Sequence, residues 1–224
     1  MKIVAVIPAF NEVKNIARVI REIKPHVSEA IVIDDGSGDE TAELARRAGA
    51  YVLRHRINRG QGAALATGME FALQNLNADI IIHYDADGQH EAKEIDELVK
   101  PIILGRAEAA LGSRFLEKKS NVPFLRKLIL KAGIIFTRIT SGLKVTDTHN
   151  GFRALSAKAA EAIEITQDRM AHASEILDEI ARHKLRYVEV AVTVRYTRES
   201  LEKGQSSLNS VRIVWEYLTG KLFK

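Results

Sequence analysis

Two carboxylates one residue apart give the strongest chemical signal in the sequence. Asp85 and Asp87 directly follow Asp79–Tyr84, an apolar run with the composition of a buried strand. Carboxylates spaced in this way at the end of a strand can face one cation, and hard oxygen ligands suit Mg²⁺ or Mn²⁺. Aspartate and glycine also end strands as simple turns, so this pair alone leaves both interpretations open.

A second acidic pair follows another short apolar run. Asp34 and Asp35 precede a Gly-Ser turn at the end of the predicted strand Ala30–Ile33. A carboxylate at such a position can accept hydrogen bonds from the base or ribose of a nucleotide. Capping of the next helix by Ser37 or Asp39 explains part of the cluster but does not require two consecutive acids. The pattern therefore favours nucleotide binding.

Three further polar segments could contribute to a site. The glycine-rich loop Asn58–Gly62 leads into a helix and could hold an anion on its backbone N–H groups, or it is a plain loop. Arg114 follows the predicted strand Ala109–Leu111 and is a candidate for phosphate contact, although an arginine there is often a solvated surface group. Asp147–Arg153 gathers polar side chains around one glycine, which is more typical of a site than of a plain turn. The histidines lack the spacing of a metal-ligand set.

The elements that must position these residues alternate between strands and helices over the first 115 residues. The predicted strands are Lys2–Ile7 (which Pro8 is expected to end), Ala30–Ile33, Tyr51–Leu53, Asp79–Tyr84 and Ala109–Leu111, and the predicted helices are Glu12–Ile23, Thr41–Ala48 and Gly60–Leu76. This alternation predicts a doubly wound, mostly parallel α/β sheet with helices on both faces. Ligands bind such sheets beyond the carboxyl ends of the strands, where the acidic pairs fall.

The remainder of the chain is less regular. It contains the expected amphipathic helices of Asn121–Leu143, the helices Ala157–Ile165 and Ala173–His183, the strand Tyr187–Tyr196 and a closing helix, Leu208–Leu222. Internal repeats and low-complexity linkers are absent from the sequence. We therefore predict a single domain over residues 1–224, with at most a soft boundary near residue 115.

The composition excludes several classes of protein. With 224 residues and 46% apolar residues, the chain is neither disordered nor a collagen-like or coiled-coil rod. It has no cysteine, which excludes a disulfide scaffold, a thiol nucleophile and a zinc ribbon and favours a reducing compartment. The net charge of +4 permits nucleic acid, membrane or phosphorylated partners and selects none of them.

The apolar stretches are too short for membrane spans or secretory signals. Pro8 ends the N-terminal run too soon for a signal core. Leu128–Ile139 is interrupted by Lys131 and Arg138 and is shorter than the about 20 residues of a spanning helix. We expect a cytoplasmic protein that is soluble or bound peripherally to the cytoplasmic membrane face.

Residues 116–144 combine positive charge with apolar side chains. They contain seven Lys or Arg residues and one Glu, a net charge of +6 that exceeds the +4 of the whole chain. Interleaved Phe, Leu and Ile residues make this basic stretch amphipathic, which is the pattern of a helix on an anionic membrane surface. An ordinary helix that packs its apolar face on the core has the same pattern. A lipid phosphate as a partner would account for both the charge and the apolar residues.

Several of these segments, taken in order, resemble one known family. They are Pro8–Glu12, Val32–Ser37, Asn58–Gly68, Asp85–His90, Gly112–Arg114 and Asp147–Arg153. Together they are similar to glycosyltransferase family 2, on the GT-A fold, and most of all to its dolichyl-phosphate mannose or glucose synthase branch. The similarity covers about residues 1–160 and extends to a C-terminal loop at Lys203–Ser207, where Ser207 stands in place of the branch's usual lysine and Lys203 would substitute.

The resemblance implies roles for individual residues. Pro8, Phe10, Glu12, Ile33 and Asp35 match positions that hold the nucleotide base and ribose; Asp85, Ala86 and Asp87 match the segment that contacts the nucleotide sugar, with Asp85, Asp87 and Gln89 in the metal positions; Arg114 matches an arginine near the phosphates; and Arg198 matches a basic residue that closes over the diphosphate. It implies that residues 1–115 bind the nucleotide sugar and that residues 116–224 form an acceptor-side extension.

The implied activity is transfer of one sugar, with inversion, from GDP-mannose or a UDP-sugar to a polyprenyl or dolichyl phosphate. Mg²⁺ or Mn²⁺ and Arg114 would stabilise the charge on the departing nucleoside diphosphate. A phosphate acceptor needs little help from a base, whereas a sugar hydroxyl would need one, for which Asp147 and Glu175 are the candidates. We therefore take Asp87, Arg114 and Asp147 as the candidate catalytic residues. The Gln-x-x-Arg-Trp signature of processive synthases is absent, which favours the transfer of one sugar.

Other functions remain as alternatives. The first is a family 2 transferase that acts on a sugar hydroxyl. The second is a nucleotidyltransferase that makes sugar nucleotides, but it should carry a glycine-rich basic loop where this chain has Pro8–Glu12. A catalytically inactive binding module is disfavoured because the carboxylates for metal and nucleotide are all present. Nucleic-acid binding is the weakest alternative, since Asp34, Asp35, Asp85 and Asp87 would repel a phosphate backbone.

Overall fold

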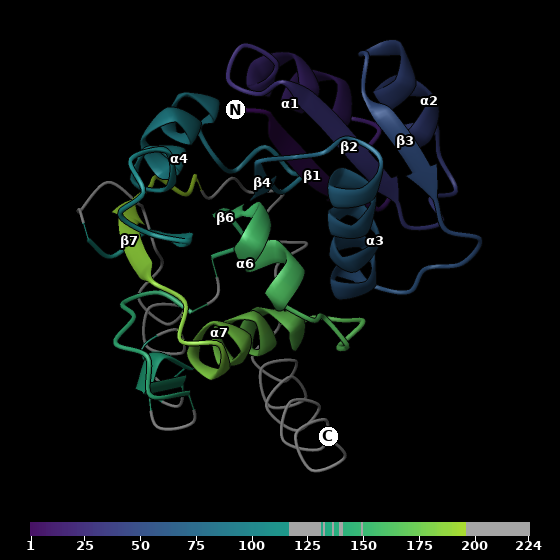
Figure 1. Cartoon of the computed structure of the whole chain (residues 1–224). Helices are drawn as coiled ribbons and strands as arrows, with labels where there is room; N and C mark the ends of the chain where they lie inside the picture. Colours follow the sequence, from purple (N-terminus) through teal and green to yellow (C-terminus); the bar gives the residue numbers. More distant parts are fainter. Residues whose placement is uncertain (117–130, 132, 136, 139–140, 149, 196–224) are drawn as a thin grey trace.

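The computed structural model describes residues 1–116, 131, 133–135, 137–138, 141–148 and 150–195, and its centre is a seven-stranded sheet in the order β3-β2-β1-β4-β6-β5-β7 (Figure 1). The strands are β1 (Ile3–Ala9), β2 (Glu29–Asp34), β3 (Tyr51–Arg54), β4 (Ile80–His83), β5 (Ala109–Ser113), β6 (Arg153–Ser156) and β7 (Tyr187–Ala191). Only β6 runs antiparallel to its neighbours β4 and β5, and the other neighbouring pairs are parallel. The predicted mostly parallel α/β sheet is therefore confirmed.

Helices cover both faces of the sheet. One face carries α1 (Ile16–Ile23), α2 (Thr41–Arg47) and α4 (Ile95–Ile103), which follows the short 3₁₀ helix η1 (Ala92–Glu94), and the other carries α3 (Gln61–Gln74), α6 (Ala157–Ala162) and α7 (His172–Arg182). Successive side chains of a strand point to opposite faces. Val4 and Val6 of β1 accordingly pack in the cluster with α3, whereas Ala5 and Ile7 pack with α1. A continuous run of branched residues is thus explained by burial on both sides.

The order of the strands divides the sheet into two halves. The strands from the first part of the chain, β1 to β4, form one half, and β5, β6 and β7 form the other. In Figure 1 these halves appear as the purple-to-blue and the teal-to-yellow parts of the molecule. Two elements, α4 and β6, were not predicted. Helix α4 contains Pro101, and β6 is only four residues long and begins with an arginine, so neither has a strong local signal.

The first strand extends beyond its expected end. We predicted that Pro8 ends the strand, but β1 continues to Ala9. The carbonyl of Val6 accepts from the N–H of Tyr84 and that of Ala9 accepts from Asp35, so alternate residues of β1 face β4 and β2. Pro8 therefore faces the β4 side, where β4 has already ended at His83. The missing N–H of the proline leaves no ladder position unfilled.

The pairing register brings the functional segments to one edge of the sheet. Ala9 at the end of β1 is level with Asp34 at the end of β2. His83 at the end of β4 is paired with Arg153, which begins the antiparallel strand β6, and Leu111 near the end of β5 is paired with the same arginine. Loops that follow β1, β2, β4 and β5 and the segment that precedes β6 therefore meet at this edge.

The close approach of α3 to the sheet gives a prediction about stability. A Cβ atom on Gly68 would lie 2.3 Å from Cγ1 of Val6 and 2.6 Å from Cδ1 of Ile33. Gly68→Ala should therefore push α3 off the sheet and lower the free energy of unfolding by about 1–3 kcal/mol, measured by urea denaturation. Gly38→Ala is the control, because nothing lies within 4 Å of its added Cβ. Equal losses in the two variants would contradict this packing argument.

Candidate active site

A cavity of about 370 Å³ opens at the edge where the carboxyl ends of the strands meet. Most of the residues predicted for the site line it: Pro8, Phe10, Glu12, Asp35, Asp85, Ala86, Asp87, Gln89 and Arg114. They come from the loops after β1, β2, β4 and β5, which are far apart in the sequence. The fold therefore gathers into one cavity the segments that sequence analysis had selected one by one.

Three predicted residues do not line this cavity. The side chain of Ile33 is fully buried in the core cluster with α3. Asp147 is also buried and lies behind Arg114, to which it is paired. Arg198 is outside the described residues, as is the C-terminal loop around Lys203, so their roles stay predictions.

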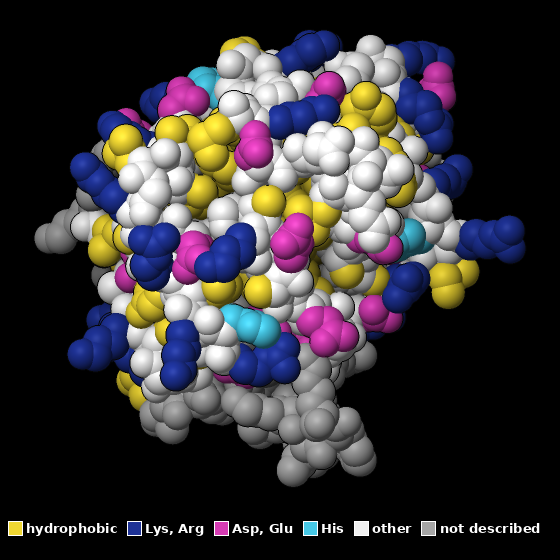
Figure 2. Space-filling view, in the orientation of Figure 1, with side chains coloured by type: hydrophobic (Ala, Val, Ile, Leu, Met, Phe, Trp, Pro, Cys, Tyr) yellow, Lys and Arg dark blue, Asp and Glu magenta, His cyan; other side chains and the backbone are white. Residues whose placement is uncertain are grey.

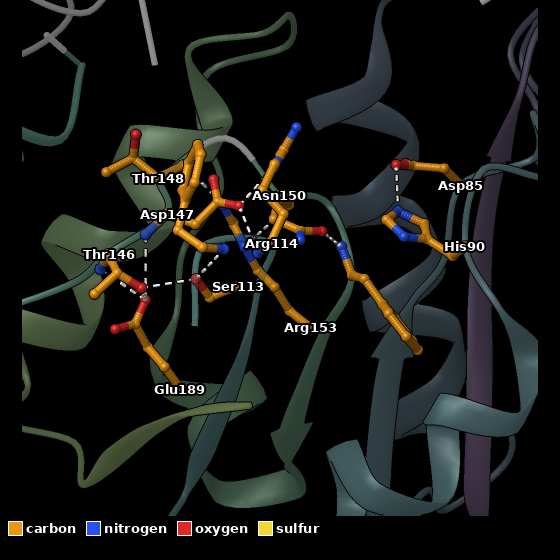
Figure 3. Close-up of polar contacts among 12 residues, drawn as sticks. Asp85, His90, Ser113, Arg114, Thr146, Asp147, Thr148, Asn150, Arg153 and Glu189 are labelled. Atoms are coloured by element: carbon orange, nitrogen blue, oxygen red, sulfur yellow. Dashed lines mark hydrogen bonds and ion pairs between the residues drawn. The ribbon is translucent and has the colours of Figure 1, made fainter. Parts of the chain in front are cut away.

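Asp85 is held in place by two side chains. Its Oδ1 accepts from Nε2 of Gln61 at 2.9 Å, and its Oδ2 lies 3.2 Å from Nε2 of His90 (Figure 3). A Cβ on Gly151 would lie 2.7 Å from Oδ2, so the glycine leaves the room that the carboxylate occupies. Burial by itself would raise the pKa of Asp85, but the hydrogen bond with His90 and the charge of Arg153 lower it. Asp85 is therefore a fixed, ionised carboxylate.

Asp87 is in a different electrostatic position. Its Oδ1 accepts from the backbone N–H of Gln89 at 3.0 Å. Burial, and then the neighbouring charge of Asp85, raise the pKa of Asp87 to about 6. Two carboxylates facing one cavity with one of them disfavoured as an anion are what a divalent cation would stabilise.

The donor set fits a cation that keeps other ligands. Among the described residues no group of three or more His, Cys, Asp or Glu side chains has metal-binding geometry. The predicted set consists of Asp85, Asp87 and the amide of Gln89, all on the cavity wall. Mg²⁺ and Mn²⁺ are commonly held by one or two carboxylates and take their remaining oxygens from water and substrate phosphates. The residues present therefore fit Mg²⁺ or Mn²⁺ better than a closed structural site.

Asp35 both lines the cavity and holds the next loop. Its two oxygens accept from the backbone N–H groups of Arg59, at 3.0 Å, and Gly60, at 2.7 Å, and Oδ1 lies 2.7 Å from Nδ1 of His55. The Asn58–Gly62 loop was considered as an anion site on backbone N–H groups. Two of those groups are bonded to Asp35, which favours the plain-loop interpretation.

The neighbouring acids have local structural roles. Oδ1 of Asp34 accepts from the N–H of Ser37 at 3.0 Å, and Oδ2 lies 3.0 Å from Nε of Arg54. Asp39 accepts from the N–H of Thr41 at the start of α2 and so caps that helix. Helix capping thus accounts for Asp39 but not for Asp35, which is the member of the acidic pair that reaches the cavity.

A buried ion pair supplies a cation on the cavity wall. Nε of Arg114 lies 2.6 Å from Oδ2 of Asp147, and the backbone N–H of Arg114 donates to the same oxygen at 3.1 Å (Figure 3). The side chains are only 6% and 0% exposed. Arg114 is therefore a fixed guanidinium and not a solvated surface group. Asp147 holds it, and the pairing occupies the carboxylate that was a candidate base.

A second buried cation, Arg153, lies beneath the site. Its guanidinium donates to the carbonyl oxygens of Asn150, Thr148 and Ala173, and so connects the segment before β6 with α7. Burial lowers the pKa of Arg153 to about 10, so it keeps its charge at neutral pH, where that charge favours ionised Asp85. Arg153 belongs to the polar segment that the sequence had marked as part of a site.

Sequence analysis missed several residues of the cavity wall: Gln61, His90, Asn150, Met170 and Val194. The first three lie inside segments that the sequence did single out, and their polar side chains were the available signal. Met170 and Val194 belong to no such segment. Val194 reaches the cavity because its backbone forms an isolated antiparallel bridge with His90.

The second candidate base has another role. Glu175, on α7, does not line the cavity. Its Oε2 accepts from the backbone N–H groups of Thr166, at 3.0 Å, and Gln167, at 2.9 Å, and it so holds the loop before α7. The carbonyl of the next residue, Asp168, accepts from the N–H of Ala63 in the first turn of α3. Glu175 therefore stabilises the loop that packs on the start of α3.

The contrast between the consecutive acids gives a testable prediction. Asp35→Ala should weaken binding of UDP or GDP by about 1–3 kcal/mol, because buried donors lose their acceptor, and should also lower the melting temperature. Asp34→Ala is the control, since it should lower the melting temperature and leave nucleotide affinity unchanged. Calorimetric titration and thermal unfolding measure the two effects. The same loss of nucleotide affinity in both variants would show that Asp35 has no specific part in binding.

Comparisons with known proteins agree with this geometry. The chain matches the model of glycosyl transferase family 2 over residues 4–164. It is 31% identical, over 98% of its length and 96% of the relative's, to a UDP-N-acetylglucosamine–dolichyl-phosphate N-acetylglucosaminyltransferase of Methanococcus voltae. It is 30% identical, over 74% of its length and 70% of the relative's, to an undecaprenyl-phosphate mannosyltransferase of Micrococcus luteus.

A solved structure has the same fold. Glucosyl-3-phosphoglycerate synthase of Mycobacterium tuberculosis, in complex with Mn²⁺ and UDP-glucose, superposes with a TM-score of 0.75 over 97% of this chain and 78% of that chain, at 23% identity. The sheet is thus the predicted GT-A fold. Since the family model matches most of the chain, the protein belongs to glycosyltransferase family 2 and is most like its dolichyl-phosphate sugar transferases.

Proposed function

We propose that this glycosyltransferase transfers one sugar from a nucleotide sugar, GDP-mannose or a UDP-sugar, to a polyprenyl or dolichyl phosphate, and that it requires Mg²⁺ or Mn²⁺. The observation that carries the proposal is the composition of one cavity wall, where Asp85 and Asp87 occur together with the buried guanidinium of Arg114. The carboxylates suit a cation and the guanidinium suits a phosphate. Relatives named for transfer to dolichyl phosphate and undecaprenyl phosphate support this acceptor class.

In this mechanism the chain's own residues orient charge. Asp85, Asp87 and Gln89 would hold the divalent ion, which when bound neutralises negative charge on the departing nucleoside diphosphate. Arg114 would donate hydrogen bonds to phosphate oxygens from a guanidinium that Asp147 already holds in place. Because these groups are positioned before the substrate arrives, little reorganisation is needed as charge develops.

The positions of the two candidate bases favour a phosphate acceptor over a sugar hydroxyl. A hydroxyl acceptor needs a base beside the reacting oxygen. Within the described residues Asp147 is paired with Arg114, Glu175 holds a loop, and neither lines the cavity. A phosphate oxygen is already anionic near neutral pH, so it needs no such base. Inversion then follows from direct attack on the anomeric carbon.

The basic stretch supports a site at a membrane surface. At its described positions residues 131–141 are helical, and on one helical face Lys131 and Arg138 flank Ile135, which is 60% exposed. Ile134 and Thr137 are buried on the opposite side. An apolar side chain between exposed cations is the pattern of a helix lying on anionic lipid. Arg126 and Lys127 lie outside the described residues.

Other features leave a peripheral location as the proposal. The structure describes no helix long and apolar enough to cross a bilayer. On the face drawn in Figure 2, the described Lys and Arg side chains are interspersed with Asp and Glu. Because residues 116–144 carry more positive charge than the whole chain does, they are the segment best suited to attract an anionic surface. We therefore propose peripheral binding to the cytoplasmic membrane face.

The metal proposal predicts opposite effects on stability and binding for one variant. Asp87→Asn should abolish Mn²⁺-dependent binding of UDP or GDP, measured by calorimetry. It should also stabilise the metal-free protein at pH 7 by about 1–3 kcal/mol. The sign follows from the raised pKa: the folded state holds the proton more tightly than the unfolded state, so stability falls as the pH rises towards 6. In wild type, Mn²⁺ affinity should fall as the pH drops below about 6.

The control for this variant is Asp96→Asn, which neutralises an exposed carboxylate on α4. It should leave Mn²⁺-dependent nucleotide binding unchanged. Full Mn²⁺-dependent binding by Asp87→Asn would remove Asp87 from the metal site.

The acceptor proposal is tested with a charge-neutralising triple variant. Replacing Arg126, Lys127 and Lys131 with Gln should reduce sedimentation with anionic liposomes and slow transfer to polyprenyl phosphate, because each exposed cation adds about 1 kcal/mol near such a surface. Hydrolysis of the nucleotide sugar by water, which needs no lipid, should survive, whereas a folding defect would lower both activities.

The matched control removes the same charge elsewhere. Arg21, Arg46 and Arg47 are exposed on α1 and α2, and their replacement with Gln should leave liposome binding and lipid transfer unchanged. If the basic-stretch variant retained both properties in full, the stretch would be an ordinary packed helix and a hydroxyl acceptor would become the leading alternative.

A further inference from the structure

We infer that Glu189, on β7, is a positioning residue that holds the guanidinium of Arg114 at the cavity through Thr146 and Asp147. Glu189 does not line the cavity, whereas Arg114 does. Its effect on the reaction must therefore pass through other residues. The inference rests on the proposed function only for the chemistry that Arg114 serves, since the hydrogen bonds exist without any ligand.

Glu189 concentrates three donors on one oxygen. Its Oε1 accepts from the backbone N–H of Thr146 at 2.7 Å, from Oγ1 of Thr146 at 2.9 Å and from the backbone N–H of Asp147 at 3.2 Å (Figure 3). Hydrogen bonds to an ionised acceptor are stronger than those between neutral groups. The glutamate thus fixes the backbone of the segment just before β6, at the two residues that lead to Arg114.

The first connection runs through Asp147. Because Glu189 fixes the N–H of Asp147, it also fixes the origin of that side chain. Oδ2 of Asp147 then accepts from Nε and from the backbone N–H of Arg114. A planar guanidinium held at Nε has little rotational freedom left. Its position in the cavity therefore depends on where Asp147 is held.

The second connection reaches the residues on either side of Arg114. Oγ1 of Thr146 lies 2.7 Å from Oγ of Ser113, and Oγ of Ser113 accepts from the N–H of Phe115 at 3.2 Å. The chain before and after Arg114 is thus tied to the same glutamate as its side chain. Losing Glu189 would release both connections together, which is why a charged acceptor at this place in β7 has a larger effect than its distance from the cavity suggests.

A purely structural role for Glu189 makes a different prediction. Strand β7 is already paired with β5, with Glu189 opposite Leu111, so the sheet does not need this side chain to hold the strand. The chain offers a matched residue at the other end of the same strands. Glu108 accepts from the backbone N–H of Arg186 at 3.0 Å and from Nζ of Lys158 at 2.7 Å, far from the cavity-lining segments.

The test follows the Arg114 side chain directly in the full-length protein. Exchange of its Nε–H with solvent is measured by nuclear magnetic resonance on protein labelled with ¹⁵N-arginine, and the resonance is assigned by its loss in Arg114→Lys. Glu189→Ala should accelerate this exchange by roughly tenfold or more, since the buried ion pair loses its support. Glu189→Gln retains an oxygen acceptor and should restore most of the protection. Glu108→Ala should lower the melting temperature without changing the exchange.

A binding cycle gives a second readout. Binding of Mn²⁺-pyrophosphate is measured for wild type, Arg114→Ala, Glu189→Ala and the double variant. If Glu189 acts through Arg114, the double variant should bind no more weakly than Arg114→Ala alone. Unchanged Nε–H exchange in Glu189→Ala, equal acceleration in Glu108→Ala, or additive losses of binding would each overturn the inference. Failure of wild type to bind a diphosphate would instead contradict the proposed function, and the exchange measurement would still decide the role of Glu189.

Discussion

Two carboxylates that share one cavity set the electrostatic problem that the rest of the site must solve. Asp85 is compensated by the protein itself, through hydrogen bonds with Gln61 and His90 and the charge of buried Arg153. Asp87 is compensated less, and its pKa rises to about 6. A chain that needed only a turn after β4 would gain nothing from burying a repelled carboxylate. The arrangement makes sense where a cation from solution completes it, and groups with such shifted pKa values concentrate at functional sites.

The acidic residues near the cavity have separate roles that the sequence does not distinguish. Asp34 and Asp39 satisfy backbone donors in the turn after β2, and Glu175 does the same for the loop before α7. Asp147 holds a guanidinium. Spacing predicted the pairs Asp34-Asp35 and Asp85-x-Asp87 because these follow strong apolar runs. Which member of a pair faces the cavity depends on side-chain partners far away in the sequence, and no local pattern contains that information.

The same limit explains which elements were predicted. Strands β1, β2 and β4 are buried on both faces, so their composition alone reveals them. Strand β6 has four residues and starts with Arg153, and it exists because β4 and β5 provide partners on both sides. Glu189 looks like an isolated acid within a strand, and its partner Thr146 is 43 residues away. Contacts of this range are settled by the assembled sheet and not by propensity.

The two halves of the sheet bring opposite charges to the cavity, and β6 fixes how they meet. The half that contains β1, β2 and β4 contributes the cavity carboxylates, whereas Arg114 follows β5 and Arg153 begins β6. At the junction His83 is paired with Arg153. Because side chains alternate along a strand, a slip of one residue would turn Arg153 to the opposite face of the sheet. The charge that favours ionised Asp85 would then be lost, together with the bonds that hold the segment before β6. The register of one short antiparallel strand therefore determines whether the carboxylates and the guanidinium face each other across the cavity.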